Sequence, residues 1–529
     1  APRAQTIQIL TSTRSTANLS LRHEGAAPAV VAAGFGGAVE AAPVTVAEPS
    51  PSAGAEHDGG VSETAWRVRH ARVSVLKDVD IPGALLAEGG HGLGAPIDLV
   101  EWAVLGSTKT ATAYLTETSF TGQFNLLTAG SFDTPQELFA SNNSARNIAF
   151  GRVSAPAGSR GDWSLSGALT QSDFSSWIVA GAYNSHAPAT HRYDVGLNFA
   201  TARYDNGNLP MLREASGSSR NASMVYGYDT YTLSPILAVA YGATYANYDY
   251  LENRNLVSPR VEMTLTPSAN VRVSAAAARR ELAPGAEEFL PPSDSGVWVP
   301  MQRTFSAVDP NNRFNAEAIA HEEIAAERDF GQTTVALRAF HQQVDNQLVT
   351  IFGLDVPGQP TAASGHYVVG NAGEAEALGY AAGVRTLIAD RVHGEIEYSF
   401  AQASLSAGRD SRYLLVLAPS TVRDKAENIH SVQGRVETDV PETSTRVLVL
   451  YRVSTGFAKA DTDRSGIDSR FDVQVRQSLP FMNFSNARWE MLVAVRNFFR
   501  EAATDQAIYD ELLVVKPPKR VVGGVTMRF

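Results

Sequence analysis

The last nine residues of the chain, Val521 to Phe529 (VVGGVTMRF), decide the fold. Successive side chains of a β-strand point to opposite faces, so every second residue shares a face. The apolar side chains here fall on one face and the polar ones on the other: Val521, Val525, Met527 and Phe529 against Thr526 and Arg528. The pattern predicts an amphipathic strand that runs to the last residue.

Segments with the same alternation recur from Ile97 onward, roughly every 20 residues, which is the rhythm of barrel strands and their connections. In two clear examples Phe471 and Val473 oppose Asp472, and Met491 opposes Glu490. A soluble β-sandwich alternates as well. Full charges on the polar face and Trp or Tyr near segment ends favour a membrane barrel with a wet lumen.

The connections between these segments are alternately short and long. Three short ones and three long ones are Thr266–Asn270, Asp329–Gln332 and Asp439–Thr443, against Ala283–Asn312, Gly353–Gly373 and Ser406–Asn428. Short turns at one end and long loops at the other are typical of outer-membrane barrels. The prediction is therefore an all-β fold, a large antiparallel transmembrane β-barrel.

The number of strands follows from counting and parity. We count about eighteen segments from Phe124 to Phe529 and one more at Ala111–Thr118, whereas single-chain bacterial barrels have even numbers of strands. Asp98–Leu105 supplies the missing first strand and is expected to pair with the last one. The count is then about 20 strands, with a range of roughly 18 to 22, and a barrel of this width encloses a channel or a plug.

The composition agrees with a barrel and excludes several other classes. The mean hydropathy of −0.13 and the hydrophobic share of 44% suit alternating faces, and we find no long apolar run that could form a transmembrane helix. The absence of cysteine excludes disulfides, thiolate metal sites and a cysteine nucleophile. A net charge of −11 disfavours contact with nucleic acid, so we predict no nucleic-acid partner.

The chain divides into three parts. Residues 1–65 are predicted to be a flexible Ala/Pro/Gly-rich periplasmic segment, residues 66–96 a connector, and residues 97–529 the outer-membrane β-barrel. The chain begins at Ala1 without the features of a signal peptide. We therefore expect that a leader has been removed or that the chain is a fragment.

Several motifs resemble the barrel portion of the TonB-dependent receptor family, in the style of its Oar-like members. They are Val257-Ser258-Pro259-Arg260-Val261, Glu327-Arg328-Asp329-Phe330, Val344-Asp345-Asn346-Gln347-Leu348, Gly370-Asn371-Ala372-Gly373 with Gly379, and the two closing segments that contain Arg496-Asn497-Phe498-Phe499 and Gly523–Phe529. Ala381 stands where the family usually has a glutamate. The resemblance covers roughly Ile97 to Phe529 and implies an outer-membrane receptor. It also implies a folded plug domain before the first strand, but the region before Ile97 is too short and too rich in Pro, Ala and Gly to form one, so we expect a barrel without a plug of its own.

The same resemblance implies a short segment that pairs with TonB by adding a strand. Two short apolar stretches, Thr6–Leu10 and Val44–Val46, have suitable character, as any such stretch would. No Gly-x-Ser-x-Gly nucleophile element and no phosphate-binding loop is present, so we predict that the protein is not an enzyme. We also predict no cofactor.

Three groups of polar or aromatic residues are candidates for a functional site. His321, His341 and His393 lie in or beside predicted strands without visible convergence, which favours isolated histidines over a metal site. Glu317, Glu322, Glu323 and Glu327 suggest paired carboxylates, but Glu322 and Glu323 must face opposite sides of a strand. Tyrosines around the loop Asp249–Asn255 could bind a glycan or siderophore, although an interfacial girdle predicts the same residues: Tyr226, Tyr228, Tyr245, Tyr248 and Tyr250.

The predicted function is transport: a TonB-dependent-receptor-like protein of the cell outer membrane that takes up or passes a ligand through its lumen. A structural or adhesive outer-membrane protein and a passive porin-like channel remain as alternatives. Val525, Met527 and Phe529 form the expected signal for the barrel-assembly machinery. Further expected partners are outer-membrane lipids and either TonB or a separate plug or periplasmic protein. The ligand-binding residues stay unknown at this point.

Overall fold

The computed structural model describes residues 121–132, 146–157, 161–171, 174–185, 190–204, 219–286, 289, 304–309, 314–353, 366–389, 391–458, 468–479, 487–496, 507–510, 512–517 and 519–529. The predicted periplasmic segment and connector lie outside these residues, as do the predicted strands at 98–105 and 111–118. The division into three parts therefore stays a prediction.

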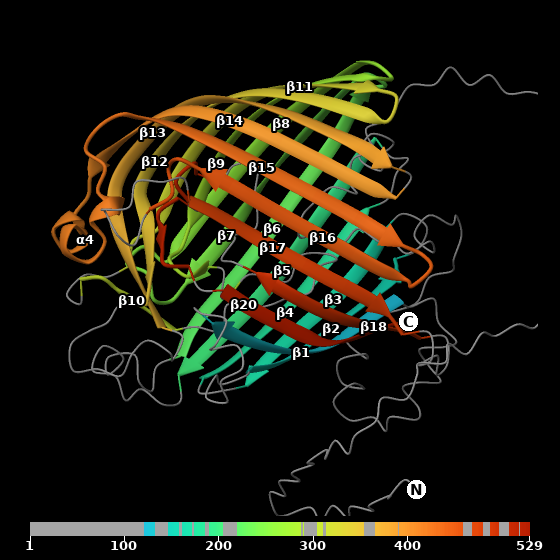
Figure 1. Cartoon of the computed structure of the whole chain (residues 1–529), viewed down its shortest axis with the longest axis horizontal. Coiled ribbons are helices and arrows are strands. Elements are labelled where there is room, and N and C mark those ends of the chain that lie inside the picture. The colour runs from blue at the N-terminus through green and yellow to red at the C-terminus, as the bar shows by residue number, and fades with distance from the viewer. Residues whose placement is uncertain are drawn as a thin grey trace, which may run out of the picture. The chain divides into compact units, whose positions relative to one another are not determined.

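Eighteen antiparallel strands form a closed barrel, and two short strands, β10 and β19, lie outside the ring (Figure 1). The strands of the ring are β1 (Thr121–Phe132), β2 (Arg146–Pro156), β3 (Gly161–Gln171), β4 (Phe174–Ser185), β5 (His191–Tyr204), β6 (Ser219–Ser234), β7 (Leu237–Tyr248), β8 (Asn255–Ser268), β9 (Val271–Leu282), β11 (Glu317–Phe330), β12 (Thr333–Phe352), β13 (His366–Ala389), β14 (Val392–Ala407), β15 (Glu427–Val440), β16 (Thr445–Ser454), β17 (Asp468–Ser478), β18 (Arg488–Arg496) and β20 (Lys519–Arg528). The predicted fold class is confirmed.

The barrel closes where its last strand meets its first. β20 pairs with β18 on one edge and with β1 on the other. Gly122 N donates to Phe529 O at 2.9 Å, and Phe529 N donates to Gly122 O at 3.0 Å. The prediction that the last strand pairs with a strand near Asp98 is wrong, because both edges of β20 are already occupied. Closure through β1 makes the ring even-numbered without the two earlier segments.

The strands alternate between an outer and an inner face, as the sequence pattern predicts. Met491 and Val493 are 43% and 45% exposed on the outside, whereas Leu492 between them is 1% exposed on the inside. Leu197 and Leu378 are also outward and about three-fifths exposed, at 58% and 62%. An apolar outer surface of this kind is stable only against lipid, since exposed apolar area is costly in water.

The connections also follow the predicted asymmetry. At one end, two-residue turns join β8 to β9 and β11 to β12, and Gly331 in the second turn has φ 65°. Thr121 and Phe529 lie at the same end as these turns. Long connections join β12 to β13 and β14 to β15 at the other end. Because short turns mark the periplasmic end of such barrels, the long connections form the extracellular mouth. The described residues contain no helix that is both long and apolar enough to span a membrane.

Candidate functional site

A small sheet crosses the extracellular mouth. The β12–β13 hairpin extends beyond its neighbours β11 and β14, and each edge of the extension receives a short parallel strand. β10 (Thr304–Ala307) pairs with β13, and β19 (Val514–Val515) pairs with β12. We call these four segments, in the order β10-β13-β12-β19, the cap sheet. In Figure 1 the ends of β12 and β13 bend across the left end of the barrel toward β10.

Three charged side chains of the barrel wall hold the cap sheet. Arg220 of β6 donates from Nη1 to Phe305 O at 2.9 Å, and Arg470 of β17 donates from Nη2 to Val514 O at 3.0 Å. Glu317 of β11 accepts a hydrogen bond of 2.7 Å from the backbone N of Leu348. β6 and β17 are nearly opposite in the ring, with β18, β20 and β1 to β5 between them on one side. The cap sheet is therefore tied to both sides of the mouth.

Apolar packing supports these polar ties. The ring of Phe305 in β10 lies 5.7 Å from that of Tyr250 and 5.5 Å from those of Phe314 and Tyr367. On the β19 side, Leu512 is fully buried. Full burial of an apolar side chain of this size stabilises by about 1.5–3 kcal/mol. The cap sheet is thus a packed element with its own core.

The connection between β18 and β20 carries β19 and is fastened by Tyr509. The hydroxyl of Tyr509 donates to Glu427 Oε1 at 2.8 Å, and Arg423 Nη1 donates to the same oxygen at 2.6 Å. Burial, followed by the neighbouring carboxylate of Glu427, raises the pKa of Tyr509. The phenol therefore remains a hydrogen-bond donor throughout the physiological pH range, and this tie does not depend on pH there.

Below the cap sheet, a row of acidic and basic side chains lines the inner wall from β8 to β20. We call this row the charge belt. Its members are Arg260, Glu262, Arg272, Glu323, Arg338, Arg385, Glu395, Glu397, Arg435, Glu437, Asp439, Arg446, Arg476, Glu490 and Arg528. Neighbouring strands contribute opposite charges, which places most members within 4 Å of a partner. The lumen wall on this side is hydrophilic but close to neutral.

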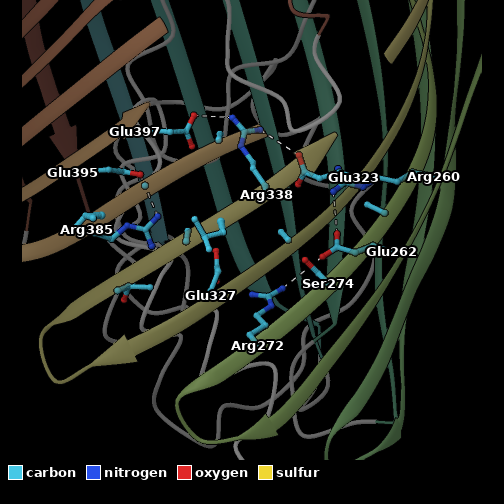
Figure 2. A pocket seen from close by; sticks show the side chains of 18 residues that line it. Arg260, Glu262, Arg272, Ser274, Glu323, Glu327, Arg338, Arg385, Glu395 and Glu397 are labelled. Carbon is cyan, nitrogen blue, oxygen red and sulfur yellow. Dashed lines mark hydrogen bonds and ion pairs between the residues drawn. The ribbon is translucent and has the colours of Figure 1, made fainter. Parts of the chain in front are cut away.

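The charge belt surrounds a cavity of about 240 Å³ between β8 and β14 (Figure 2). Arg338 projects into it and donates to Glu323 at 3.3 Å and to Glu397 at 2.7 Å. Four arginines and five glutamates line the cavity. Such a wall favours a polar solute with groups of both signs over a strongly charged or apolar one, because a net field of one sign is absent.

The opposite inner wall, on β1 to β6, has a different character. Its inward side chains combine small or apolar ones, such as Leu127, Ile148 and Ala200, with uncharged polar ones, such as Asn125, Thr170 and Asn198, all at most 6% exposed. The sequence pattern predicts one apolar side and one polar or small side on each strand, and it is confirmed here, since Thr170 and Asn198 lie on the inner face while Leu169 and Leu197 face outward. This side of the lumen therefore mixes small, apolar and polar groups, whereas the other side carries the charge belt.

The three histidines considered as metal ligands are separated. His321 faces the lumen with 2% exposure, and His341 faces outward, 3.3 Å from Glu376. His393 lies on the inner face at the periplasmic end of β14. Within the described ranges no three His, Asp or Glu side chains converge on a point.

The four glutamates also separate by face. Glu322 points outward and Glu323 into the lumen, which confirms the predicted split. Glu323 and Glu327 line the cavity, whereas Glu317 holds the cap sheet. Glu317, Glu323 and Glu327 therefore share the inner face of β11, because they lie an even number of residues apart.

The tyrosines near the β7–β8 connection lie in three environments. Tyr245 faces outward with 46% exposure, in accord with an interfacial girdle. Tyr228 faces inward and contacts Thr244, with 2.9 Å between their hydroxyl oxygens, and Tyr226 lies beside it. Tyr248 and Tyr250 pack on Phe289 below the cap sheet. The girdle interpretation is wrong for these inward tyrosines, because strand register places them in the lumen.

Of the three residues that hold the cap sheet, the sequence analysis names Glu317, as part of an acidic group, but neither Arg220 nor Arg470. Alternation places Arg470 and Arg220 on inner faces, but nothing local distinguishes an inner arginine in the charge belt from one that ties a distant segment. The one available signal is the interruption of β12. Its register shifts after Val344, and Asn346 adopts φ 57° in a segment that otherwise alternates.

The closed antiparallel ring, the apolar outer face and the capped, charge-lined lumen define a membrane transport barrel. The family model described as TonB dependent receptor-like, beta-barrel matches residues 90–475, which is more than half of the sequence. The chain belongs to this family. Its members are outer-membrane transporters and receptors rather than enzymes, and the protein is an outer-membrane ligand-transport barrel.

The solved structures that match the chain are distant from it in sequence. The siderophore receptor PirA from Pseudomonas aeruginosa is 13% identical, with 78% of this chain and 81% of that chain covered and a TM-score of 0.35. The FrpB iron transporter from Neisseria meningitidis, F5-1 variant in its apoprotein form, is 9% identical. The match covers 79% of this chain and 83% of that chain, with a TM-score of 0.39. The ferric yersiniabactin uptake receptor FyuA from Yersinia pestis is 10% identical. The match covers 78% of this chain and 68% of that chain, with a TM-score of 0.36. No curated protein matches the sequence.

Proposed function

We propose that the protein imports a polar solute by TonB-driven opening of a capped lumen. The observation that carries the proposal is the cap sheet, which ties opposite sides of the mouth together above the cavity in the charge belt. A passive porin needs a mouth that stays open. A lumen that is capped but lined with charged side chains instead suits a polar solute that passes only after an energy-driven opening of the cap.

The solute class follows from the wall chemistry. The cavity presents guanidinium and carboxylate groups in nearly equal numbers, and those groups are already paired with one another. A solute with both donors and acceptors, such as a metal chelate, an oligosaccharide or a short peptide, can replace these pairs without leaving a buried charge alone. An apolar solute cannot.

Uptake in cells tests the proposal. Cells that produce the full chain are supplied with a panel of radiolabelled ferric chelates, oligosaccharides and short peptides, with and without a functional TonB system. Accumulation of at least one probe that requires both this protein and TonB is the expected result, together with its loss when residues 1–65 are deleted. Entry of small solutes regardless of TonB would identify a passive channel and overturn the proposal.

A second function, adhesion to a surface partner, is favoured by one helix. The helix α4 (Ser411–Leu417), in the β14–β15 connection, buries Leu414 but exposes Leu415 to 57% and Val416 to 81%. Exposed apolar side chains at the mouth are a suitable contact surface for another protein. If a Val416→Asp variant takes up solute normally but no longer binds to a cell surface, adhesion is separate from transport.

The proposal extends to assembly and lipid contact. Val525 and Met527 lie on the outer face of β20, opposite Leu126 and Phe124 of β1, and Phe529 bonds to Gly122 at the closing seam. We infer that the assembly machinery reads these three β20 positions before the seam closes. Outer-membrane lipids then cover the same face.

A further inference from the structure

We propose that a hydrogen-bonded chain through His321 fastens the cap to the lumen wall and releases it when His321 takes up a proton. The hydrogen-bonded chain runs from Ile508, in the connection that carries β19, through Gln342 to His321 in the lumen wall. On its other side, His321 Nε2 lies 3.6 Å from Glu323 in the charge belt, too far for a hydrogen bond. We call these four residues the latch. The inference rests on the proposed function, because it concerns the regulation of the same gate.

The geometry of the latch fixes the position of its protons. The backbone N of Ile508 donates to Gln342 Oε1 at 2.9 Å, and a backbone N–H can only donate. The other amide atom of Gln342, Nε2, therefore carries two hydrogens and lies 2.9 Å from His321 Nδ1. That nitrogen must be a bare acceptor. In the latched state His321 is consequently neutral, with its proton on Nε2, which lies 3.6 Å from Glu323 Oε2.

A second proton on His321 is incompatible with this arrangement. A protonated imidazole donates from both nitrogens, so its Nδ1–H would face the NH₂ group of Gln342. Rotation of the amide offers an acceptor to His321 but turns the NH₂ group toward the N–H of Ile508. One buried hydrogen bond is lost in either case, since His321 and Gln342 are only 2% and 4% exposed. A loss of this kind raises the released fraction by roughly 5- to 150-fold.

Several charged groups lie around His321. Glu323, with its side chain 9% exposed, lies next to the ring, and Arg338 shares the carboxylate of Glu323. On β9, Arg280 faces the same side as Ile319, two residues before His321. Glu317 on the same strand is bonded to the cap sheet, and on β12 the ring of Phe340 lies 6.3 Å from the imidazole. A further charged residue, Asp510, lies in the β18–β20 connection, two residues after Ile508.

Acid conditions therefore favour release. The latched state requires Nδ1 of His321 to be without a proton, whereas in the released state Nδ1 can take one up, so one proton accompanies opening. Linkage limits the slope: the ratio of released to latched molecules rises at most about tenfold for each unit of decrease in pH.

Hydrogen exchange of the full chain in lipid nanodiscs tests the proposal without any transported solute. The observable is the protection of the Ile508 amide at pH 8 and pH 5, after correction for the intrinsic exchange rate. In the wild type, protection is expected to decrease on acidification with a slope of up to about tenfold per pH unit. A His321→Asn variant keeps an acceptor near the position of Nδ1 but does not titrate, so this decrease should vanish.

Three further variants complete the experiment. Gln342→Leu removes the acceptor and should leave Ile508 unprotected at both pH values. Gln342→Glu offers carboxylate oxygens to both Ile508 and a protonated His321, and should keep the amide protected in acid. The matched control, His341→Asn, changes a histidine on the outer face and should preserve the wild-type response.

Two results would overturn the latch: wild-type protection of Ile508 that is equal at both pH values, or a response to pH that persists in His321→Asn. A heat-modifiability gel on every variant shows whether the barrel has folded, so a misfolded variant is not mistaken for a released cap. Because no solute or TonB is needed, the latch can fail while TonB-dependent uptake stands, and the reverse outcome is equally readable.

Discussion

Replacement of Arg470 by methionine should detach β19 from the barrel wall without unfolding the barrel. The Arg470 side chain is 1% exposed, donates to Val514 O at 3.0 Å, and stacks over the ring of Phe457 with its Cζ 4.2 Å from the centroid. A hydrogen bond from a charged donor contributes about 1.5–3 kcal/mol. A desolvated cation–π contact adds about 0.5–2 kcal/mol.

The attachment of the β18–β20 connection to the barrel wall should therefore weaken by about 2–4 kcal/mol, because methionine retains part of the packing volume but neither polar interaction. Since 1.4 kcal/mol corresponds to a factor of ten, the open population of this connection should increase by roughly 30- to 1,000-fold. Amide exchange at Val514 and Val515 measures that population, and ion conductance in planar bilayers reports whether the mouth opens as a result.

Arg452→Met is the matched control. Arg452 lies opposite Arg470 on the neighbouring strand β16, 6.0 Å from the same ring of Phe457, but its Nε bonds to Ser431 of the wall rather than to the β18–β20 connection. This variant should leave exchange at Val514 unchanged. Equal exchange in wild type and Arg470→Met would refute the assignment of Arg470 as a tie of the cap sheet.

Three other outcomes are expected. Phe529→Ser should slow barrel assembly in cells, measured as loss of the heat-modifiable band, and normal assembly would contradict its role as a signal. Leu197→Arg, at an outward position 58% exposed, should destabilise the folded barrel by about 2–4 kcal/mol in vesicle refolding, whereas Gln343→Arg on the polar outer rim should not. The Arg391 guanidinium lowers the pKa of Glu442 in the β15–β16 turn, so this contribution to stability exists above the ordinary carboxyl pKa and disappears as pH falls through the lowered value. Arg391→Met should return the Glu442 titration, followed by NMR, to its ordinary range; an unchanged titration would exclude this cause.

The outer face of the barrel could be predicted because it depends on a local rule. Met491 and Val493 face lipid for the same reason that Val525 and Met527 do: side chains two residues apart on a strand share a face, whatever the rest of the chain does. The rhythm of short and long connections is equally local, and it sufficed to orient the barrel. The family resemblance was visible for the same reason, since its motifs lie on individual strands and turns.

The closing pair of strands could not be predicted from local pattern. Any amphipathic segment near the start of the barrel is a suitable neighbour for β20. The rule of even strand numbers predicts Asp98–Leu105 as that neighbour. Closure depends instead on the register summed over all intervening strands, which brings Gly122 to Phe529.

The sequence by itself determined that the chain forms a wide membrane barrel with alternating faces and two unlike ends, because period-two alternation and loop length are properties of neighbouring residues. The tertiary structure alone decided the gate. His321 meets Gln342 only through strand register, Ile508 reaches Gln342 across 166 positions, and Arg470 reaches Val514 across 44. Such contacts exist only after the ring has closed, since closure fixes which inner side chains lie within hydrogen-bonding distance of the segments that cross the mouth.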